Sequence, residues 1–313
     1  MTLDNNFMLS VVLPIFNEEK NIPILILELT KALEPYNNYE IIFVNDGSTD
    51  ESETLIKNSC NQNPKIKLIN LSRNFGHQEA LTAGLENAKG DAIIMMDGDM
   101  QDPPSLIPQL VKKWKEGYEV VYTVKKKRNE PLFRRFLFNQ FHKVFALLSE
   151  YEMPMNTGIF SLIDKKILKI IISLEEKNKY ITGLRYWVGF NQCSIEFERP
   201  DRLEGEPKQT LPRLFKLAMD GIFSFSNKPL EIAFFIGMTI TILSFLLICV
   251  ILYIKLFTTK AIPGYATYTS IILFMGGINI FISGILGRYI SMIFKDTKNR
   301  PVYLVKNKIN LGE

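Results

Sequence analysis

Two aspartates one residue apart, Asp97 and Asp99, are the residues whose types and spacing are best suited to chemistry. They directly follow the apolar run 92–96, so they should lie at the carboxyl end of a buried strand, where open α/β sheets bind ligands. Proteins commonly hold Mg²⁺ or Mn²⁺ through one or two carboxylates while substrate phosphates complete the coordination. The pair therefore predicts a metal site and a diphosphate-bearing substrate, whereas an isolated Asp-Gly-Asp would indicate only a polar turn with Gly98 at positive φ.

The elements that must position this pair are four short β-rich segments separated by stretches of helical length and period. These segments are 9–14, 40–44, 66–71 and 92–96. Such alternation predicts an α/β fold with a parallel, doubly wound sheet. One helix should have Asn21 as its N-cap and Pro23 in its first turn, and another should span about 77–88. Polar residues follow every strand, which predicts a nucleotide-sized crevice along one sheet edge.

The chain has neither G-x-G-x-x-G after its first strand nor G-x-x-x-x-G-K-[ST], so dinucleotide-binding and P-loop folds lose support. Four other motifs follow the strands instead, at 11–19 (VVLPIFNEE), 44–50 (VNDGSTD), 71–78 (LSRNFGHQ) and 96–104 (MDGDMQDPP). With these motifs the chain resembles the family 2 glycosyltransferases of GT-A fold. Within them it is similar to the polyprenyl-phosphate glycosyltransferases, the group of dolichol-phosphate mannose synthases and prophage bactoprenol glucosyltransferases. The resemblance covers nearly the whole chain.

The resemblance implies inverting transfer of a sugar from a nucleotide sugar, with UDP-glucose as the expected donor, to a polyprenyl phosphate such as undecaprenyl phosphate. It also implies a role for each strand end. Asp99 would hold Mg²⁺ or Mn²⁺, Asp97 would act through water or ribose, and Gln101 would complete the metal shell or contact the diphosphate. Nucleotide-sugar contacts are expected at Pro14, Phe16, Asn17, Glu18, Asp46, Asn74 and Gly76. His77 is expected either to touch the sugar site or to serve a structural role.

The expected acceptor, a polyprenyl phosphate, is largely ionised at neutral pH because its second pKa is about 6. It needs no strong general base, but positive charge is needed to bring two anions together. The basic residues expected to supply it are Arg134, Arg135, Arg202 and Lys208. One departure from the family is visible: many members carry Asp-x-Gly-Asp-Phe-Arg where this chain has Asn156-Thr157-Gly158-Ile159-Phe160-Ser161. Two acids and an arginine are missing, so no base can be assigned there.

Two long uncharged stretches, 233–254 and 261–287, follow the catalytic segment. Each could cross a hydrocarbon core of about 30 Å at about 1.5 Å per residue, so a hairpin of two transmembrane helices is expected. The predicted organisation is a GT-A domain over 1–198, a juxtamembrane segment with amphipathic helical spacing over 199–229, transmembrane helices at about 233–254 and 266–287 within 230–287, and a cytoplasmic basic tail over 288–313. Phe215 of the juxtamembrane segment is expected to meet the lipid acceptor.

Basic residues are more frequent outside the two stretches than between them, which predicts a catalytic domain in the cytoplasm and a multi-pass protein of the inner (plasma) membrane. A net charge of +4 favours an anionic lipid surface. Three cysteines without metal-ligand spacing fit a reducing compartment. Small residues in the second stretch allow a homo-oligomer through close helix packing, and no nucleic-acid partner is expected.

Two other functions stay open. A processive polysaccharide synthase would share the Asp97–Asp99 site but should carry Gln-x-x-Arg-Trp and more membrane spans; the nearest segment, 183–187, reads Gly-Leu-Arg-Tyr-Trp. A non-enzymatic membrane scaffold with a degenerate nucleotide-sugar site is favoured only by the altered segment 156–161 and opposed by the intact acid pair.

Overall fold

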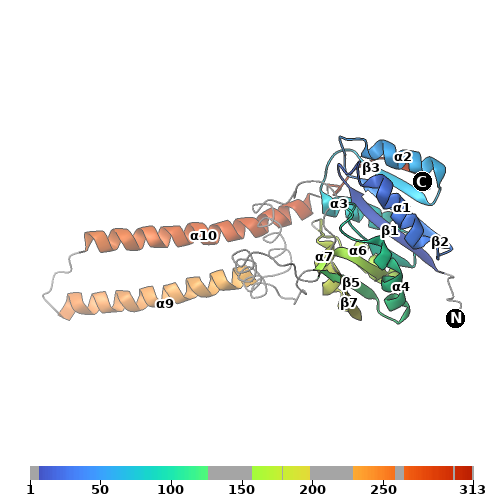
Figure 1. Cartoon of the computed structure of the whole chain (residues 1–313). Coiled ribbons are helices and arrows are strands. Elements are labelled where there is room, and N and C mark those ends of the chain that lie inside the picture. The colour runs from blue at the N-terminus through green and yellow to red at the C-terminus, as the bar shows by residue number, and fades with distance from the viewer. Residues whose placement is uncertain are drawn as a thin grey trace, which may run out of the picture. The chain divides into compact units, whose positions relative to one another are not determined.

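The computed structural model describes residues 7–125, 157–177, 179–197, 228–257, 264–298 and 300–311. These residues belong to two compact units (Figure 1). The sheet unit contains the described residues up to 197 together with 300–311, and the helical unit contains 228–257 and 264–298.

The sheet unit is built on one eight-stranded sheet with the strand order β7-β5-β6-β4-β1-β2-β3-β8. Its strands are β1 (Met8–Ile15), β2 (Asn38–Asn45), β3 (Ile66–Leu71), β4 (Ala92–Met95), β5 (Val120–Lys125), β6 (Thr157–Asp164), β7 (Gln192–Phe197) and β8 (Val305–Ile309). The helices around it are α1 (Ile22–Leu33), α2 (Ser52–Gln62), α3 (His77–Asn87), α4 (Ile107–Lys115), α6 (Lys165–Ser173) and α7 (Ile181–Trp187), with a short 3₁₀ turn at Pro104–Leu106.

The central strands β4, β1, β2 and β3 are parallel neighbours, as the alternating sequence pattern predicts. The four predicted strands are confirmed within two residues at each end, and so are the start of the first predicted helix and both ends of the second. Asn21 is the N-cap of α1, but its side chain does not cap the helix. Its amide donates instead to the Glu18 carboxylate at 2.6 Å, so the residue serves the loop that precedes the helix.

Beyond β4 the sheet turns antiparallel, which makes it mostly rather than wholly parallel. β6 runs antiparallel to β4, with Met95 opposite Ser161, and β5 runs antiparallel to β6. β7 then pairs in parallel with β5. This arrangement brings the first residues of β6 to the same sheet edge as the residues that follow β4.

Two helical layers cover the sheet, because successive side chains of a strand point to opposite faces. Val11 and Leu13 of β1 share the main core cluster with residues of α1, α2 and α4. Val12 points to the other face, where α3 packs so closely that a Cβ added to Gly84 would lie 2.3 Å from a methyl group of Val12. The core is therefore apolar on both faces of the parallel strands, as expected for a doubly wound sheet.

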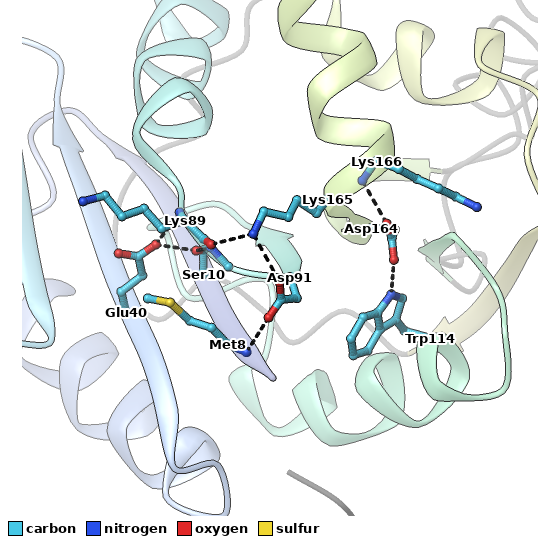
Figure 2. Close-up of polar contacts among 10 residues, drawn as sticks. Met8, Ser10, Glu40, Lys89, Asp91, Trp114, Asp164, Lys165 and Lys166 are labelled. Carbon is cyan, nitrogen blue, oxygen red and sulfur yellow. Dashed lines mark hydrogen bonds and ion pairs between the residues drawn. The ribbon is translucent and has the colours of Figure 1, made fainter. Parts of the chain in front are cut away.

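Polar contacts fix the amino ends of the parallel strands (Figure 2). The carboxylate of Glu40 is buried and accepts hydrogen bonds from the Ser10 hydroxyl at 2.5 Å and from the Lys89 backbone N–H at 2.7 Å. Asp91 accepts a hydrogen bond from the Met8 backbone N–H at 3.0 Å. A buried carboxylate is stable when such donors satisfy it, so these contacts secure the sheet on the edge away from Asp97 and Asp99.

The segment 288–313, which the sequence suggests is a basic tail, is divided differently in the structure. Helix α10 continues to Thr297, and Val305–Ile309 forms strand β8, which pairs antiparallel with β3. Exposed lysines in β8 hide its strand character in the sequence, whereas the open edge of β3 provides the backbone partners that order it.

The helical unit consists of α9 (Lys228–Phe257) and α10 (Tyr265–Thr297), which contact each other. In the part of the chain that the structure describes, no helix combines the length and hydropathy of a membrane-crossing helix. The two spans predicted at about 233–254 and 266–287 are therefore not confirmed.

Candidate active site

The candidate site lies where β4, β1, β2 and β3 end side by side. Since these strands are parallel neighbours, the four segments that follow them share one edge of the sheet. These segments are 16–20, 46–51, 72–76 and 96–102. The predicted crevice-forming edge is thus present, and it gathers the predicted residues Phe16, Asn17, Glu18, Asp46, Asn74, Gly76, Asp97, Asp99 and Gln101, while Pro14 is buried within β1 next to it.

Reciprocal hydrogen bonds lock the loops after β1 and β2 together. The Asn17 backbone N–H donates to the Ser48 hydroxyl at 3.1 Å, and the Thr49 backbone N–H donates to the Asn17 side-chain oxygen at 2.8 Å. Asn17 has φ of 54°, a conformation that asparagine tolerates better than most residues. The Glu18 backbone N–H donates to the Ser52 hydroxyl at 3.0 Å. The two loops therefore form one preorganised wall of the site.

Asp46 joins the loop after β2 to the loop after β3. Its buried carboxylate accepts hydrogen bonds from the backbone N–H groups of Phe75 at 2.7 Å and Gly76 at 3.0 Å. Burial raises the pKa of Asp46, and the two N–H donors offset this rise only in part. The loops come so close that a Cβ on Gly47, which has φ of +66°, would lie 2.5 Å from the Arg73 carbonyl carbon. Asp46 therefore shapes the site whether or not it also touches a nucleotide.

Asp97 is held between a histidine and a second aspartate. Its Oδ1 lies 2.8 Å from Nε2 of His77, the first residue of α3, and its backbone N–H donates to the Asp102 carboxylate at 3.2 Å. Burial lowers the pKa of His77, but the hydrogen bond and charge of Asp97, together with the charges of Asp46 and Glu79, outweigh it and raise the pKa above its ordinary value. The structure places His77 beside Asp97, where it helps to position that side chain, and its expected contact with the sugar stays a prediction.

Asp99 and Gln101 lie on a tight turn next to Asp97. The Gln101 backbone N–H donates to Asp99 Oδ1 at 3.1 Å, and Met100 between them has φ of +61°, a strained value for a residue other than glycine. Gly98 is not among the residues of positive φ, and a Cβ there would lie 2.4 Å from the end of the Ile15 side chain, which would have to shift.

These residues fit a divalent cation that is held jointly with a substrate. Among the described residues, no group of three or more His, Cys, Asp or Glu side chains could hold a metal ion by itself. Mg²⁺ is usually bound by only one or two carboxylates plus substrate phosphates, so Asp97, Asp99 and the Gln101 amide are a sufficient oxygen donor set once a diphosphate is present.

Several predicted residues fall outside the described part of the chain. They are the acceptor residues Arg134, Arg135, Arg202, Lys208 and Phe215, together with residues 199–227 of the predicted juxtamembrane segment 199–229. Their roles stay predictions.

Sequence reasoning missed two residues that the structure brings to this edge. Asp102 is buried and holds the Asp97 backbone, and its only signal in the sequence is its place just before Pro103 and Pro104. Arg185 of α7 is fully buried, and both of its terminal nitrogens lie 3.3 Å from the Gly158 carbonyl oxygen at the start of β6. Nothing in the sequence signals the burial of this arginine.

The comparisons with known proteins agree with this fold and site, which together define a sugar-transferring enzyme. Residues 10–171 match the family model described as Glycosyl transferase family 2. The match covers more than half of the chain, so the chain belongs to glycosyl transferase family 2 and is a glycosyltransferase. The non-enzymatic alternative is not retained.

Curated relatives are similar along nearly the whole chain. The uncharacterized glycosyltransferase sll0501 of Synechocystis is 41% identical over 302 residues, which cover 96% of this chain and 95% of the relative. The uncharacterized glycosyltransferase YkcC of Bacillus subtilis is 40% identical over 311 residues, covering 99% and 96%. The bactoprenol glucosyl transferase of Shigella phage SfV is 35% identical over 303 residues, covering 96% and 98%.

Proposed function

We propose that this protein transfers glucose from UDP-glucose to a polyprenyl phosphate, such as undecaprenyl phosphate, with inversion at the anomeric carbon. The observation that carries the proposal is the acid edge formed by Asp97 and Asp99 in a chain that matches bactoprenol glucosyl transferases from end to end. The name of those relatives supports the lipid acceptor and the glucosyl group.

The reaction brings two anions together, the UDP-glucose donor and the acceptor phosphate, and releases UDP. An ionised oxygen of the acceptor phosphate attacks the anomeric carbon of glucose from the side opposite the diphosphate, the bond from that carbon to the diphosphate oxygen breaks, and UDP leaves. No proton has to be removed from the nucleophile, because the phosphate is already ionised. The missing acids of segment 156–161 are therefore compatible with catalysis.

The residues at the strand ends would have separate roles in binding the metal, the nucleoside and the diphosphate. Asp99 and Asp97, with Gln101, would hold Mg²⁺ or Mn²⁺, whose charge would offset the charge that develops on the leaving diphosphate. Asp102 and His77 hold Asp97 in place. The wall made by the loops after β1 and β2 would bind the nucleoside, and the side-chain amide of Asn74 would approach the diphosphate. The backbone N–H of Gly76 is already bound to Asp46, so Gly76 would only let the chain pass close to the diphosphate.

The composition of the helical unit supports a membrane location. Helix α9 carries no charged residue between Glu231 and Lys255, and large apolar side chains along it are exposed, among them Phe234, Phe245 and Tyr253. We propose that α9 and α10 cross the inner membrane as a hairpin and that the sheet unit works at the cytoplasmic face. Exposed apolar surface of this extent is stable in contact with lipid and unfavourable in water.

The test is to incubate membranes that contain the protein with radiolabelled UDP-glucose and Mg²⁺ or Mn²⁺. Label should enter a chloroform-soluble lipid that mild acid hydrolyses to free glucose. Asp99→Asn should lose nearly all of this activity, at least about a hundredfold, because a cation ligand at the strand end is removed without disturbing the core. Glu34→Gln, which changes an exposed acid at the far end of α1, is the matched control and should keep full activity.

Each arm of this assay can contradict the proposal. Label in a polymer that does not enter the organic phase would indicate a processive synthase. Lipid labelling from another nucleotide sugar but not from UDP-glucose would disprove the donor. Near-normal turnover of Asp99→Asn at saturating metal would disprove the metal assignment.

A further inference from the structure

Arg185 is a buried cation whose charge no carboxylate balances among the described residues. It is the largest fully buried side chain in the described part of the sheet unit. Within the described ranges, its terminal nitrogens donate to the Gly158 carbonyl and, at 3.3 Å, to the Tyr186 hydroxyl, and its Nε has no hydrogen-bond partner. The rings of Tyr122 and Tyr186 lie 5.5 and 5.0 Å from the guanidinium carbon.

Such an arrangement is costly for the resting protein. Buried charges are normally paired, and the attraction of aromatic rings and one carbonyl oxygen replaces only part of the lost hydration. Burial lowers the pKa of Arg185, yet a guanidinium stays protonated in proteins at neutral pH. Because the buried charge of Arg185 is destabilising and no carboxylate in the described part of the chain balances it, a functional role for the charge is expected.

Two contacts join Arg185 to the edge that carries Asp97. The Ile181 backbone N–H, at the start of α7, donates to the Gln78 side-chain oxygen at 3.1 Å, and Gln78 follows His77 directly. On the other side, Gly158 precedes Ser161, which lies opposite Met95 in the antiparallel pair of β4 and β6. Gly158 and Asp97 therefore continue neighbouring strands toward the same edge of the sheet.

The start of β6, whose Gly158 carbonyl Arg185 contacts, carries no acid. Residues 157–161 read Thr-Gly-Ile-Phe-Ser. The groups that face the guanidinium are the phenols of Tyr122, Tyr180 and Tyr186. Tyrosine ionises only near pH 10, and burial raises the pKa of Tyr122 and Tyr180 further, so Tyr122 and Tyr180 are neutral near neutral pH.

We propose that Arg185 is a specificity-determining residue whose fixed positive charge makes the β6 side of the active site selective for an acceptor that carries an ionised phosphate. This inference rests on the proposed function. The charge acts through the protein interior and not by contact, because Arg185 is fully buried. A charge in a medium of low dielectric constant is weakly screened, so it favours an anion several ångströms away more than a surface lysine would.

The test compares Arg185→Met, which keeps the volume and removes the charge, with Arg185→Lys, which keeps the charge and loses the planar fork. Arg185→Met should raise the KM for the polyprenyl phosphate about tenfold or more, while the Kd for UDP changes less than about twofold. The acid limb of kcat/KM for the acceptor should also move up by roughly half a pH unit or more, because a phosphate loses its second proton less readily without the nearby cation. Arg185→Lys should leave that limb in place.

A second pair of variants tests the charge without removing the arginine. Ser161 is buried on β6 directly opposite Tyr122, so Ser161→Asp would place a carboxylate near Arg185, and Ser161→Asn is its uncharged control of equal size. The aspartate variant should reproduce the shift of the acid limb, and the asparagine variant should not.

The outcomes separate the possible explanations. If the wild-type enzyme makes no lipid-linked sugar, the proposed function fails. If it does, but Arg185→Met and Ser161→Asp leave the acceptor KM and the acid limb unchanged, the electrostatic role is wrong. Equal losses in Arg185→Met and Arg185→Lys, with lower Tm and an unmoved acid limb, would show that Arg185 only holds Gly158. A weaker Kd for UDP in Arg185→Met would assign the charge to the donor diphosphate instead and would also overturn the inference.

Discussion

Three aspartates of the site outside the metal pair accept hydrogen bonds from backbone N–H groups. Asp46 binds the loop after β3, Asp102 binds Asp97, and Asp50 accepts from the backbone N–H of Glu19 at 3.1 Å. A carboxylate offers two acceptor oxygens, so one side chain can satisfy donors from segments far apart in the sequence. Much of the acidity of this edge therefore maintains its shape.

Asp46→Asn should weaken both the fold and donor binding. An asparagine can accept one of the two N–H donors of Phe75 and Gly76, but its NH₂ group faces the other. We expect the free energy of unfolding to fall by about 1 to 2 kcal/mol and the Kd for UDP to rise. Urea denaturation and calorimetric titration with UDP measure the two effects, and an unchanged Kd would remove Asp46 from the donor site.

Asp50→Asn should show a pH-dependent loss of stability. Burial raises the pKa of Asp50, but hydrogen bonds from the Ser52 hydroxyl and from the backbone of Glu19 and Ser52 outweigh it and hold the pKa below its ordinary value. A carboxyl with a lowered pKa stabilises the fold above the unfolded value of about 3.9, and this contribution is lost as the pH falls through the folded value.

The Asp50→Asn variant should therefore be less stable than wild type at neutral pH by about 1 kcal/mol, and this difference should shrink as the pH falls below the unfolded value of about 3.9. Urea unfolding across this range tests the expectation. Glu34→Gln, at an exposed position, serves as the control and should show no such convergence. A constant difference between wild type and Asp50→Asn at every pH would contradict the role of the ionised carboxylate.

At the scale of elements, β8 completes the sheet through side chains as well as backbone. Asn45, Asn70 and Asn307 are register partners on β2, β3 and β8. Asn45 donates to Asn70 at 2.9 Å, and Asn70 donates to Asn307 at 2.8 Å. Since Asn45 directly precedes Asp46, this row of amides connects the last strand of the chain to the candidate donor site.

Asn307→Leu should consequently affect stability and donor binding together. The buried amide of Asn70 would lose an acceptor, which we expect to cost about 1 kcal/mol and to loosen the end of β2. Lys306→Gln, at an exposed neighbouring position on the same strand, should change neither. Parallel measurements of urea unfolding and of UDP affinity on both variants decide the point, and equal behaviour of the two would argue against the amide row.

The strands and helices that the sequence predicted are those with strong local signals. The parallel sheet and its functional edge were predicted from the apolar runs at β1 and β4 and from the acids that follow β4. The signal of β8 was hidden, because Lys306 and Lys308 make a five-residue strand resemble a basic tail. Which acid binds which backbone N–H, as at Asp46, depends on loops that are 30 residues apart and could not be predicted from spacing. Arg185 was missed because charged residues are expected at the surface.

At the scale of the whole molecule, the chain leaves the sheet unit for α9 and α10 and then returns to it with β8. The segments on both sides of the helical unit therefore belong to one folded body. If the two helices cross a membrane, they must do so an even number of times, so the sheet unit and the C-terminal strand lie on the same side.

A topology experiment tests this directly. In intact cells that contain the protein, a cysteine introduced by Thr259→Cys, between the two helices, should react with a membrane-impermeant maleimide from outside. A cysteine introduced at an exposed position of β8, Lys306→Cys, should react only after the cells are opened. Labelling of both from outside, or of neither, would contradict the hairpin.

The late position of β8 in the sequence also sets the order in which the protein can mature. During synthesis β1, β2 and β3 emerge early and can begin to fold as a unit, but β3 keeps an unpaired edge until β8 has been synthesised. Because α9 and α10 precede β8 in the sequence, both helices are synthesised before this strand can pair. The row of Asn45, Asn70 and Asn307 is thus completed only after both helices have been made, so a chain in which β8 has not yet paired should bind a nucleotide at the neighbouring loops poorly.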